Sequence, residues 1–171
     1  MKELPNRKLN RLHGYDYSEY GYYFVTICTK NREKFFGKIQ GSETVLNEYG
    51  KIVEKQWLWL AQQYRYIQLD KYIIMPNHMH GILIIRRDRS RPVPTITIVH
   101  TKTKSLSQLI GAFKTTSSKI IRLNGLTEFF WQRSFYDHII HDEKSLFNIR
   151  EYIQNNPLRS KNDLNVEKNF I

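Results

Sequence analysis

The feature that most limits the fold of this chain is the alternation of strand-like and helix-like patterns along it. Residues 22–29 are consecutive aromatic and β-branched residues, which is typical of a buried strand. Residues 47–63 then carry apolar side chains at helical spacing behind a capping asparagine. Two more strand patterns, near 66–75 and 79–86, are separated by the short Pro76-Asn77 connection, so they are predicted to form a hairpin.

The second half of the chain continues the same alternation. Ser105 precedes a helical pattern that ends at Asn124-Gly125, and residues 131–140 are predicted to form a fourth strand. Asp142 is placed to cap a third helix, which Pro157 is expected to stop. The residues between the two halves, 87–104, show no helical period and are predicted to be a mobile, basic excursion.

The resulting order, β-α-β-β-α-β-α, predicts an α+β fold. Its first six elements have the order of the ferredoxin-like split β-α-β arrangement, an antiparallel sheet with helices on one face, and the third helix is an addition at the C-terminal end. A length of 171 residues fits a single domain over 1–171. Within it, 1–20 form a basic N-terminal segment, and 161–171 are expected to be a frayed tail.

The net charge is the property of the composition that bears on function. The chain has 27 Lys and Arg against 16 Asp and Glu, a net charge of +11, which attracts polyanions. Nucleic acid is therefore the leading partner, and the alternative is a merely basic protein with a solvated charged surface. No apolar run approaches the length of a spanning helix, and a single cysteine excludes an internal disulfide framework. We expect no membrane partner and a cytoplasmic, nucleoid-associated protein.

Two histidines form the first candidate site. His78 and His80 are separated by one residue on a predicted strand, so their imidazoles point to the same face and could bind one cation, while Met79 turns into the core. Zinc is disfavoured because the chain has one cysteine, and a hard divalent cation, magnesium or manganese, is expected instead. Further ligands are open: His100, His138 and His141 are possible partners, and a purely structural role for the pair is the alternative.

The second candidate lies on the third predicted helix. Tyr152 and Asn156 are four residues apart, which places a phenol and a carboxamide one turn apart on one face. The amide oxygen suits a hard metal, and Pro157 predicts that Asn156 is the C-terminal cap. The alternatives are that Tyr152 only packs against the core and that Asn156 is an ordinary helix cap. Tyr136 is the next candidate site tyrosine, ranked below Tyr152.

Five stretches of this sequence, in order along the chain, resemble the REP-associated tyrosine transposases, relatives of the single-tyrosine insertion-sequence transposases within the HUH nuclease superfamily. The stretches that carry the resemblance are 16–27, 75–81, 105–114, 131–140 and 152–157. Together they extend over about residues 7 to 160, and the family's fold agrees with the predicted order of elements.

The resemblance implies a site and a reaction. His78 and His80 match the metal-binding pair, Tyr152 the nucleophile, and Asn156 the third protein ligand, where relatives often have glutamine. The implied activity is cleavage and rejoining of single-stranded DNA next to hairpins, through a 5′-phosphotyrosine linkage and a free 3′-hydroxyl, with no small-molecule cofactor. A monomer is favoured over a homodimer.

Basic residues supply the expected phosphate contacts. The candidates are Arg86, Arg87, Arg89, Arg91, Lys114, Lys119, Arg122 and Arg133. Three other functions stay open: a non-catalytic hairpin-binding protein on the same fold, a metal-dependent phosphodiesterase with no tyrosyl intermediate, and an RNA-binding module. The last would need aromatic residues spaced on two central strands, and the sequence shows no clear match to that pattern.

Overall fold

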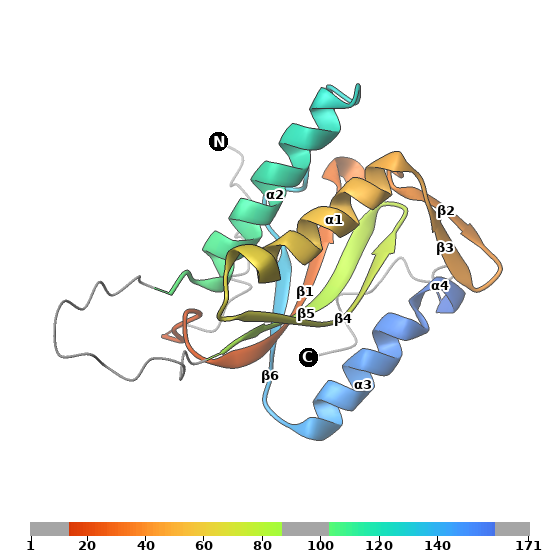
Figure 1. Cartoon of the computed structure of the whole chain (residues 1–171). Coiled ribbons are helices and arrows are strands. Elements are labelled where there is room, and N and C mark those ends of the chain that lie inside the picture. Colours follow the sequence, from red (N-terminus) through yellow and green to blue (C-terminus); the bar gives the residue numbers. More distant parts are fainter. Residues whose placement is uncertain (1–13, 87–102, 160–171) are drawn as a thin grey trace, which may run out of the picture.

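The computed structural model describes residues 14–86 and 103–159, and it has one four-stranded antiparallel sheet with helices on both faces (Figure 1). In chain order the elements are β1 (Gly21–Cys28), a 3-10 turn (Lys30–Arg32), β2 (Gly37–Gln40), β3 (Glu43–Leu46), α1 (Glu48–Gln63), β4 (Ile67–Met75), β5 (His78–Ile85), α2 (Leu106–Leu123), β6 (Tyr136–Ile140), α3 (Glu143–Gln154) and α4 (Asn156–Arg159). The α+β class predicted from the sequence is confirmed.

The strand order β4-β5-β1-β6 makes both β-α-β units split ones. β5 lies between β1 and β4, the two strands that α1 connects, and β1 lies between β5 and β6, the two strands that α2 connects. The β4–β5 hairpin is confirmed, with Met75 opposite His78 at its turn. The split connections bring β1 and β5, which are distant in sequence, side by side at the centre of the sheet.

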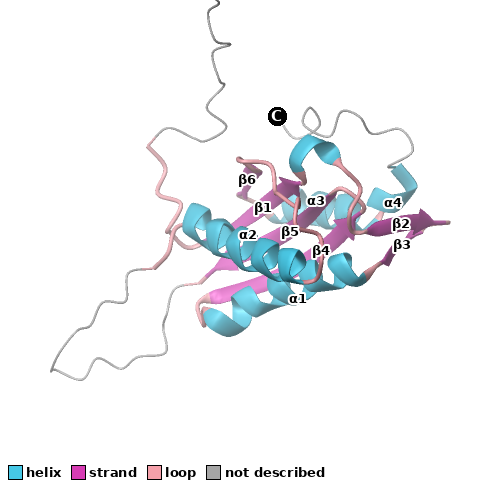
Figure 2. Cartoon of the chain, turned by 90° about the horizontal axis from the view of Figure 1, so that it is seen from above, coloured by secondary structure: helices cyan, strands magenta, loops and turns pink. Residues whose placement is uncertain are grey.

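Alternation along the central strands sorts their side chains between two faces. One face is covered by α1 and α2 (Figure 2), and there Val25, Met79 and Leu83 belong to the larger core cluster. On the other, Phe24 and Ile82 belong to a second cluster with Ile149, Tyr152 and Ile153 of α3. The predicted C-terminal helix therefore packs on the sheet face opposite to α1 and α2. As predicted, Met79 turns into the core.

The three long helices begin where the sequence predicts. Asn47 accepts from the backbone N–H of Gly50, and Asp142 accepts from that of Ser145. Ser105 forms a reciprocal capping box with Gln108. These caps satisfy N–H groups that a helix leaves unpaired at its start.

Two strand predictions are wrong. The hairpin of β2 and β3 lies between the predicted strand at 22–29 and the predicted helix at 47–63, where no strand is predicted, because strands of four residues carry too little alternation to be recognised. The strand predicted over 131–140 begins only at Tyr136. Before it, Trp131 forms an isolated bridge with Thr29, and the carbonyls of Gln132 and Ser134 accept from a lysine side chain instead of a strand.

The predicted end of the third helix is also wrong. The C-cap of α3 is Asn155, and Asn156 begins the short helix α4, with Pro157 following it. Proline lacks only an N–H that the first turn of a helix leaves unpaired anyway, so it starts a helix as readily as it stops one. The predicted excursion at 87–104 and the two terminal segments fall mostly outside the described residues. Among the helices that the structure describes, none is long and apolar enough to cross a membrane.

Gly81 allows α1 to pack closely on β5, and this predicts the effect of two substitutions. A Cβ on Gly81 would lie 2.6 Å from Cζ2 of Trp57, which is completely buried. Gly81→Ala should therefore cost about 1–3 kcal/mol by overpacking, seen as a lower Tm. Gly111, in α2, has no atom within 4 Å of the added Cβ, so Gly111→Ala should stabilise the protein by about 0.5–1 kcal/mol. Equal Tm values for the two variants would contradict this packing.

Candidate functional site

The two histidines of β5 converge on one point. His78 and His80 share the sheet face opposite to α1 and α2, and their Nε2 atoms are 3.1 Å apart. His80 is completely buried and His78 is 8% exposed. The other ring nitrogen of each histidine is bound within the fold: Nδ1 of His80 lies 2.8 Å from Oγ1 of Thr26, and Nδ1 of His78 lies 2.6 Å from Oδ1 of Asn77.

The hydrogen-bond pattern assigns the tautomers. Nδ2 of Asn77 donates to the backbone carbonyl of Arg32, so Oδ1 of Asn77 accepts from Nδ1–H of His78. Nε2 of His78 therefore carries a lone pair, and Nε2–H of His80 donates to it. For both Nε2 lone pairs to face one cation, His80 must carry its proton on Nδ1, where the hydroxyl of Thr26 can accept it. Thr26 can serve either tautomer, because a hydroxyl both donates and accepts.

Both imidazoles are neutral at physiological pH. Burial, and then the positive charge of Arg32, lowers the pKa of His78 to about 4. Burial also lowers the pKa of His80 well below its usual value, followed by the charges of His78 and Arg32. Neutral imidazole is the form that binds metals, so the site is ready for a cation without first losing a proton to solvent.

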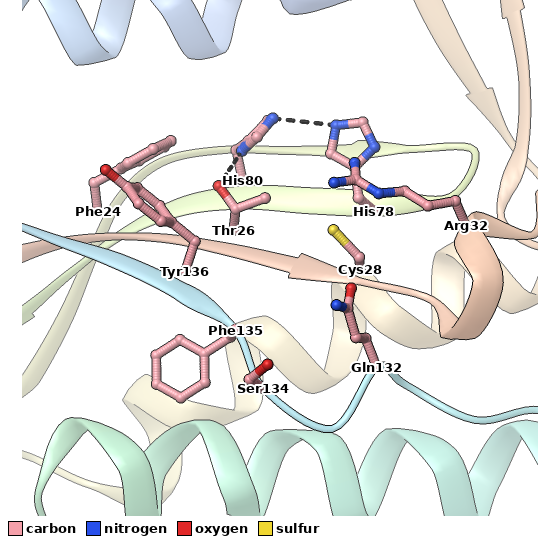
Figure 3. Close-up of a pocket in the computed structure, with 10 residues that line it drawn as sticks. All are labelled: Phe24, Thr26, Cys28, Arg32, His78, His80, Gln132, Ser134, Phe135 and Tyr136. Carbon is pink, nitrogen blue, oxygen red and sulfur yellow. Dashed lines mark hydrogen bonds between the residues drawn. The ribbon is translucent and has the colours of Figure 1, made fainter. Parts of the chain in front are cut away.

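A cavity opens beside the histidines (Figure 3). The residues that line it come from β1, the turn after it, β5, and the segment before β6: Phe24, Thr26, Cys28, Arg32, His78, His80, Gln132, Ser134, Phe135 and Tyr136. Arg32 extends over His78 at one side, and Gln132 brings a carboxamide to the opposite wall. The cavity thus combines two imidazoles, one guanidinium and several neutral polar groups.

Tyr152 lies against the histidines from the α3 side. Its ring centroid is 5.3 Å from that of His80, and Phe24 packs on both rings. Only 4% of Tyr152 is exposed, and it is not one of the residues that line the cavity. Tyr136, the tyrosine ranked second from the sequence, does line it. The structure therefore brings both candidate tyrosines to the histidine pair, one through a ring contact and one through the cavity wall.

Asn156 is 2% exposed and lies outside the cavity wall. Its neighbours in sequence, Gln154 and Pro157, line a second hollow beside Ile73 and Ile74 of β4. Ile73 is paired with His80, so the turn between α3 and α4 lies at the end of the sheet that holds the histidines. Gln132 is the carboxamide that lines the cavity itself.

The basic residues predicted to contact phosphates differ in exposure and in their partners. Arg86, Lys119 and Arg133 are exposed, and Arg122 is half-buried, with its guanidinium over the ring of Phe130. Lys114 already has partners: its Nζ donates to the carbonyls of Gln132 and Ser134 at 2.8 and 3.0 Å, and burial lowers its pKa to about 8. Arg87, Arg89 and Arg91 lie outside the described residues.

Sequence reasoning missed several residues of this site. Arg32 lies outside every predicted element and Gln132 lies in a predicted strand, and the structure brings both to the cavity. Thr26 is paired with His80 across the sheet, and Asn77 adjoins His78 in the hairpin turn. The Pro76-Asn77 punctuation was the one signal that could have drawn attention to Asn77.

Comparison with known proteins shows which class of protein this chain resembles. A family model described as transposase IS200 like matches residues 95–156, the stretch that includes Tyr152 and Asn156. An uncharacterised protein of Haemophilus influenzae is 38% identical over 167 residues, covering 94% of this chain and 93% of the relative. A second protein of that organism, named as a REP-associated tyrosine transposase, is 27% identical and covers 84% and 74% of the two chains.

The fold also has a solved counterpart, a REP-associated tyrosine transposase bound to a REP hairpin. It superposes with a TM-score of 0.58 at 16% identity, over 94% of this chain and 74% of the other. The class of protein that this chain resembles is thus that of the transposases. More narrowly, residues 95–156 match the IS200-like transposase family, and the chain is similar to a REP-associated tyrosine transposase.

The contacts of Lys114 predict its effect on stability. Lys114→Met removes the donor from the carbonyls of Gln132 and Ser134, which should cost about 1–3 kcal/mol, or about 2–12 °C in Tm for a chain of this size. Lys119→Met, at an exposed position of the same helix, should stay within about 0.5 kcal/mol of the wild type. Thermal unfolding by circular dichroism compares the two, and equal effects would show that the ammonium does not hold this segment.

Proposed function

We propose that this transposase cleaves and rejoins single-stranded DNA next to hairpins through a 5′-phosphotyrosine intermediate, with a bound divalent cation. The observation that carries the proposal is the pair of neutral imidazoles whose Nε2 atoms lie 3.1 Å apart, with the ring of Tyr152 5.3 Å from that of His80. A hairpin substrate is supported by the similar fold of a transposase bound to a REP hairpin, and by the net charge of +11.

The donor set fits a hard divalent cation. At metal–nitrogen distances of about 2.1 Å, two adjacent ligands of an octahedral ion are about 3.0 Å apart, close to the separation of the two Nε2 atoms. In the parts of the chain that the structure describes, no group of three His, Cys, Asp or Glu side chains is placed to hold a metal ion. Amide, water and phosphate oxygens are therefore the proposed remaining ligands, a set that suits Mg²⁺ or Mn²⁺.

His78 and His80 would hold this cation, with the amide oxygen of Asn156 as the proposed third protein ligand. Gln132 is the alternative, because its carboxamide lines the cavity. When bound, the metal polarises the scissile phosphate and neutralises charge that develops on its oxygens. The residues of this chain supply the nucleophile, hold the phosphate and fix the imidazole tautomers.

Tyr152 is the proposed nucleophile. Its phenolic oxygen forms a bond to phosphorus, the bond from phosphorus to the 3′ oxygen breaks, the phenol gives up its proton, and the leaving oxygen takes up a proton to become the 3′-hydroxyl. Because the phosphodiester energy is kept in the covalent bond, a 3′-hydroxyl can later reverse the step without ATP. Since Tyr152 is almost completely buried, DNA must gain access to it before the reaction.

Arg86, Arg87, Lys119, Arg122 and Arg133 are proposed to contact DNA phosphates away from the reacting group. Such contacts strengthen binding with little dependence on sequence, and weaken as salt rises. The ammonium of Lys114, predicted with them, is bound to two backbone carbonyls, and we propose that it acts on DNA through the position of Gln132 and Ser134. A monomer remains the proposed state.

The test of the reaction is a covalent DNA adduct. The protein is incubated with single-stranded DNA that contains hairpins and randomised flanks, with Mn²⁺, with Mg²⁺ or with chelator, and is then run on a denaturing gel. We expect a metal-dependent adduct that peptide mass spectrometry maps to Tyr152. Tyr152→Phe should abolish the adduct, whereas Tyr136→Phe, the matched change at the cavity wall, should retain it.

Other results would favour other functions. Hairpin binding without adduct or cleavage, across many flanks and both metals, would indicate the non-catalytic binding protein. Cleavage that persists in Tyr152→Phe but is lost in His78→Ala would indicate a phosphodiesterase with no tyrosyl intermediate. An adduct that moves to Tyr136 would show that the cavity tyrosine is the nucleophile.

The hydroxyl of Thr26 predicts a change in metal affinity. Thr26→Val keeps the side-chain shape but removes the group that accepts Nδ1–H of His80 when Nε2 faces a cation. Loss of such a partner typically lowers metal affinity by about 10–100-fold. We expect a drop of this size for Mn²⁺, measured by the electron paramagnetic resonance of free Mn²⁺, while Thr116→Val on α2 leaves the affinity unchanged. Equal Mn²⁺ affinity in wild type and Thr26→Val would overturn this role.

A further inference from the structure

The turn that follows β1 has an unusual backbone. Asn31 and Arg32 adopt positive φ angles of 55° and 58°, the left-handed region that residues with side chains rarely occupy. Two consecutive residues in this region persist only where their surroundings fix them. Here the hydroxyl of Thr29 donates to the carbonyls of Glu33 and Asn77, at 2.7 and 2.9 Å, and the N–H of Arg32 donates to the carbonyl of Thr29.

This backbone directs Arg32 to the cavity. Figure 3 shows its side chain reaching from the turn over the imidazole of His78, so that the guanidinium lies on the cavity side of the ring. A cation placed beside two neutral imidazoles adds a charge that the metal-binding pair does not need. That charge opposes binding of a metal cation but attracts an anion such as a phosphate.

Asn77 connects the turn to the histidines. Its Nδ2 donates to the carbonyl of Arg32 at 3.1 Å, and its Oδ1 accepts from Nδ1 of His78 at 2.6 Å. One carboxamide therefore fixes both the left-handed residue and the metal-facing imidazole. Because Asn77 is itself part of the β4–β5 turn, the separation of Arg32 from His78 is set by the sheet and not by a flexible side chain alone.

We propose that Arg32 binds the phosphodiester at this site, and that Asn77 is the positioning residue that fixes Arg32 and His78 relative to one another. The proposal rests on the proposed function, because it names the group that receives the reacting phosphate. A guanidinium presents several N–H donors in one plane, a geometry that matches two oxygens of a phosphate. The strained turn is then explained, since a relaxed backbone would carry the side chain away from the imidazoles.

Binding of a single phosphodiester tests Arg32 directly. Thymidylyl-(3′,5′)-thymidine is titrated into the whole protein, with and without Mg²⁺, and the Nε–H signal of Arg32 is followed by NMR. We expect a saturable shift of this signal in the wild type. Arg32→Gly should weaken binding about tenfold or more while keeping the Tm at or near the wild-type value, because glycine accepts a positive φ without strain.

Arg65→Ala is the matched control for charge, since it removes one exposed arginine between α1 and β4. It should leave dinucleotide binding unchanged. Equal affinities for Arg32→Gly and wild type, or an equal loss in Arg65→Ala, would overturn the assignment of Arg32.

Two substitutions separate the functions of Asn77. Asn77→Asp keeps an oxygen for Nδ1–H of His78 but lacks the donor to the carbonyl of Arg32, whereas Asn77→Ala lacks both. Both variants should move the Arg32 signal and weaken dinucleotide binding, and only Asn77→Ala should also change the tautomer pattern of the His78 ring nitrogens. Asn31→Asp adds the same charge next to Arg32, in the turn after β1, and should not reproduce these effects. Unchanged binding in Asn77→Asp, or equal loss in Asn31→Asp, would overturn the role of Asn77.

These results are distinguishable from a failure of the proposed function. If wild type forms no adduct at Tyr152 yet binds the dinucleotide through Arg32, the tyrosine chemistry is wrong and the phosphate site stands. If the adduct forms and Arg32→Gly forms it at the wild-type rate, the function stands and the assignment of Arg32 is wrong.

Discussion

The period of two along β5 is the constraint on which the rest of the structure depends. Met79 and Leu83 must face α1 and α2 for the larger core to form, and this places His78 and His80 on the opposite face. Gly81 lies between Met79 and Leu83 on the same face and lets Trp57 of α1 approach the strand. The same alternation on β1 supplies Thr26 as a partner for His80. Packing of the apolar side chains thus orients the imidazoles without any ligand.

Burial gives these imidazoles properties that the surface of the protein could not. On a chain with a net charge of +11, an exposed histidine pair would be screened by solvent and free to rotate. Here the ring of His80 packs against Phe24 and Tyr152, and both rings are hydrogen-bonded at Nδ1. Their orientation is therefore fixed before a ligand arrives, which is the general requirement for a site that must hold a reacting group closely.

The sequence was sufficient to predict those elements whose hydrophobic pattern extends over many residues. The helical periods and caps of α1, α2 and α3, the β4–β5 hairpin and the facing of His78 and His80 all follow from local spacing. The β2–β3 hairpin is too short to show a period. The place of Asn156 depends on whether Pro157 ends one helix or begins another, which local rules allow equally. Arg32 reaches the site through a turn held by Thr29 and Asn77, and no local pattern encodes such a long-range contact.

The location of Asn77 between two paired strands has a consequence for how this site can change in evolution. Insertion of one residue after Pro76 would shift the phase of β5, so that both imidazoles would enter the core of α1 and α2 and Met79 would emerge. Insertion of two residues would restore the phase but would move the histidines past Thr26 and separate Asn77 from the turn at Arg32. The loop joining β2 to β3 has no such coupling to the cavity. Insertions and deletions among descendants of this chain should therefore occur in the β2–β3 hairpin, while the Pro76-Asn77 turn keeps a constant length.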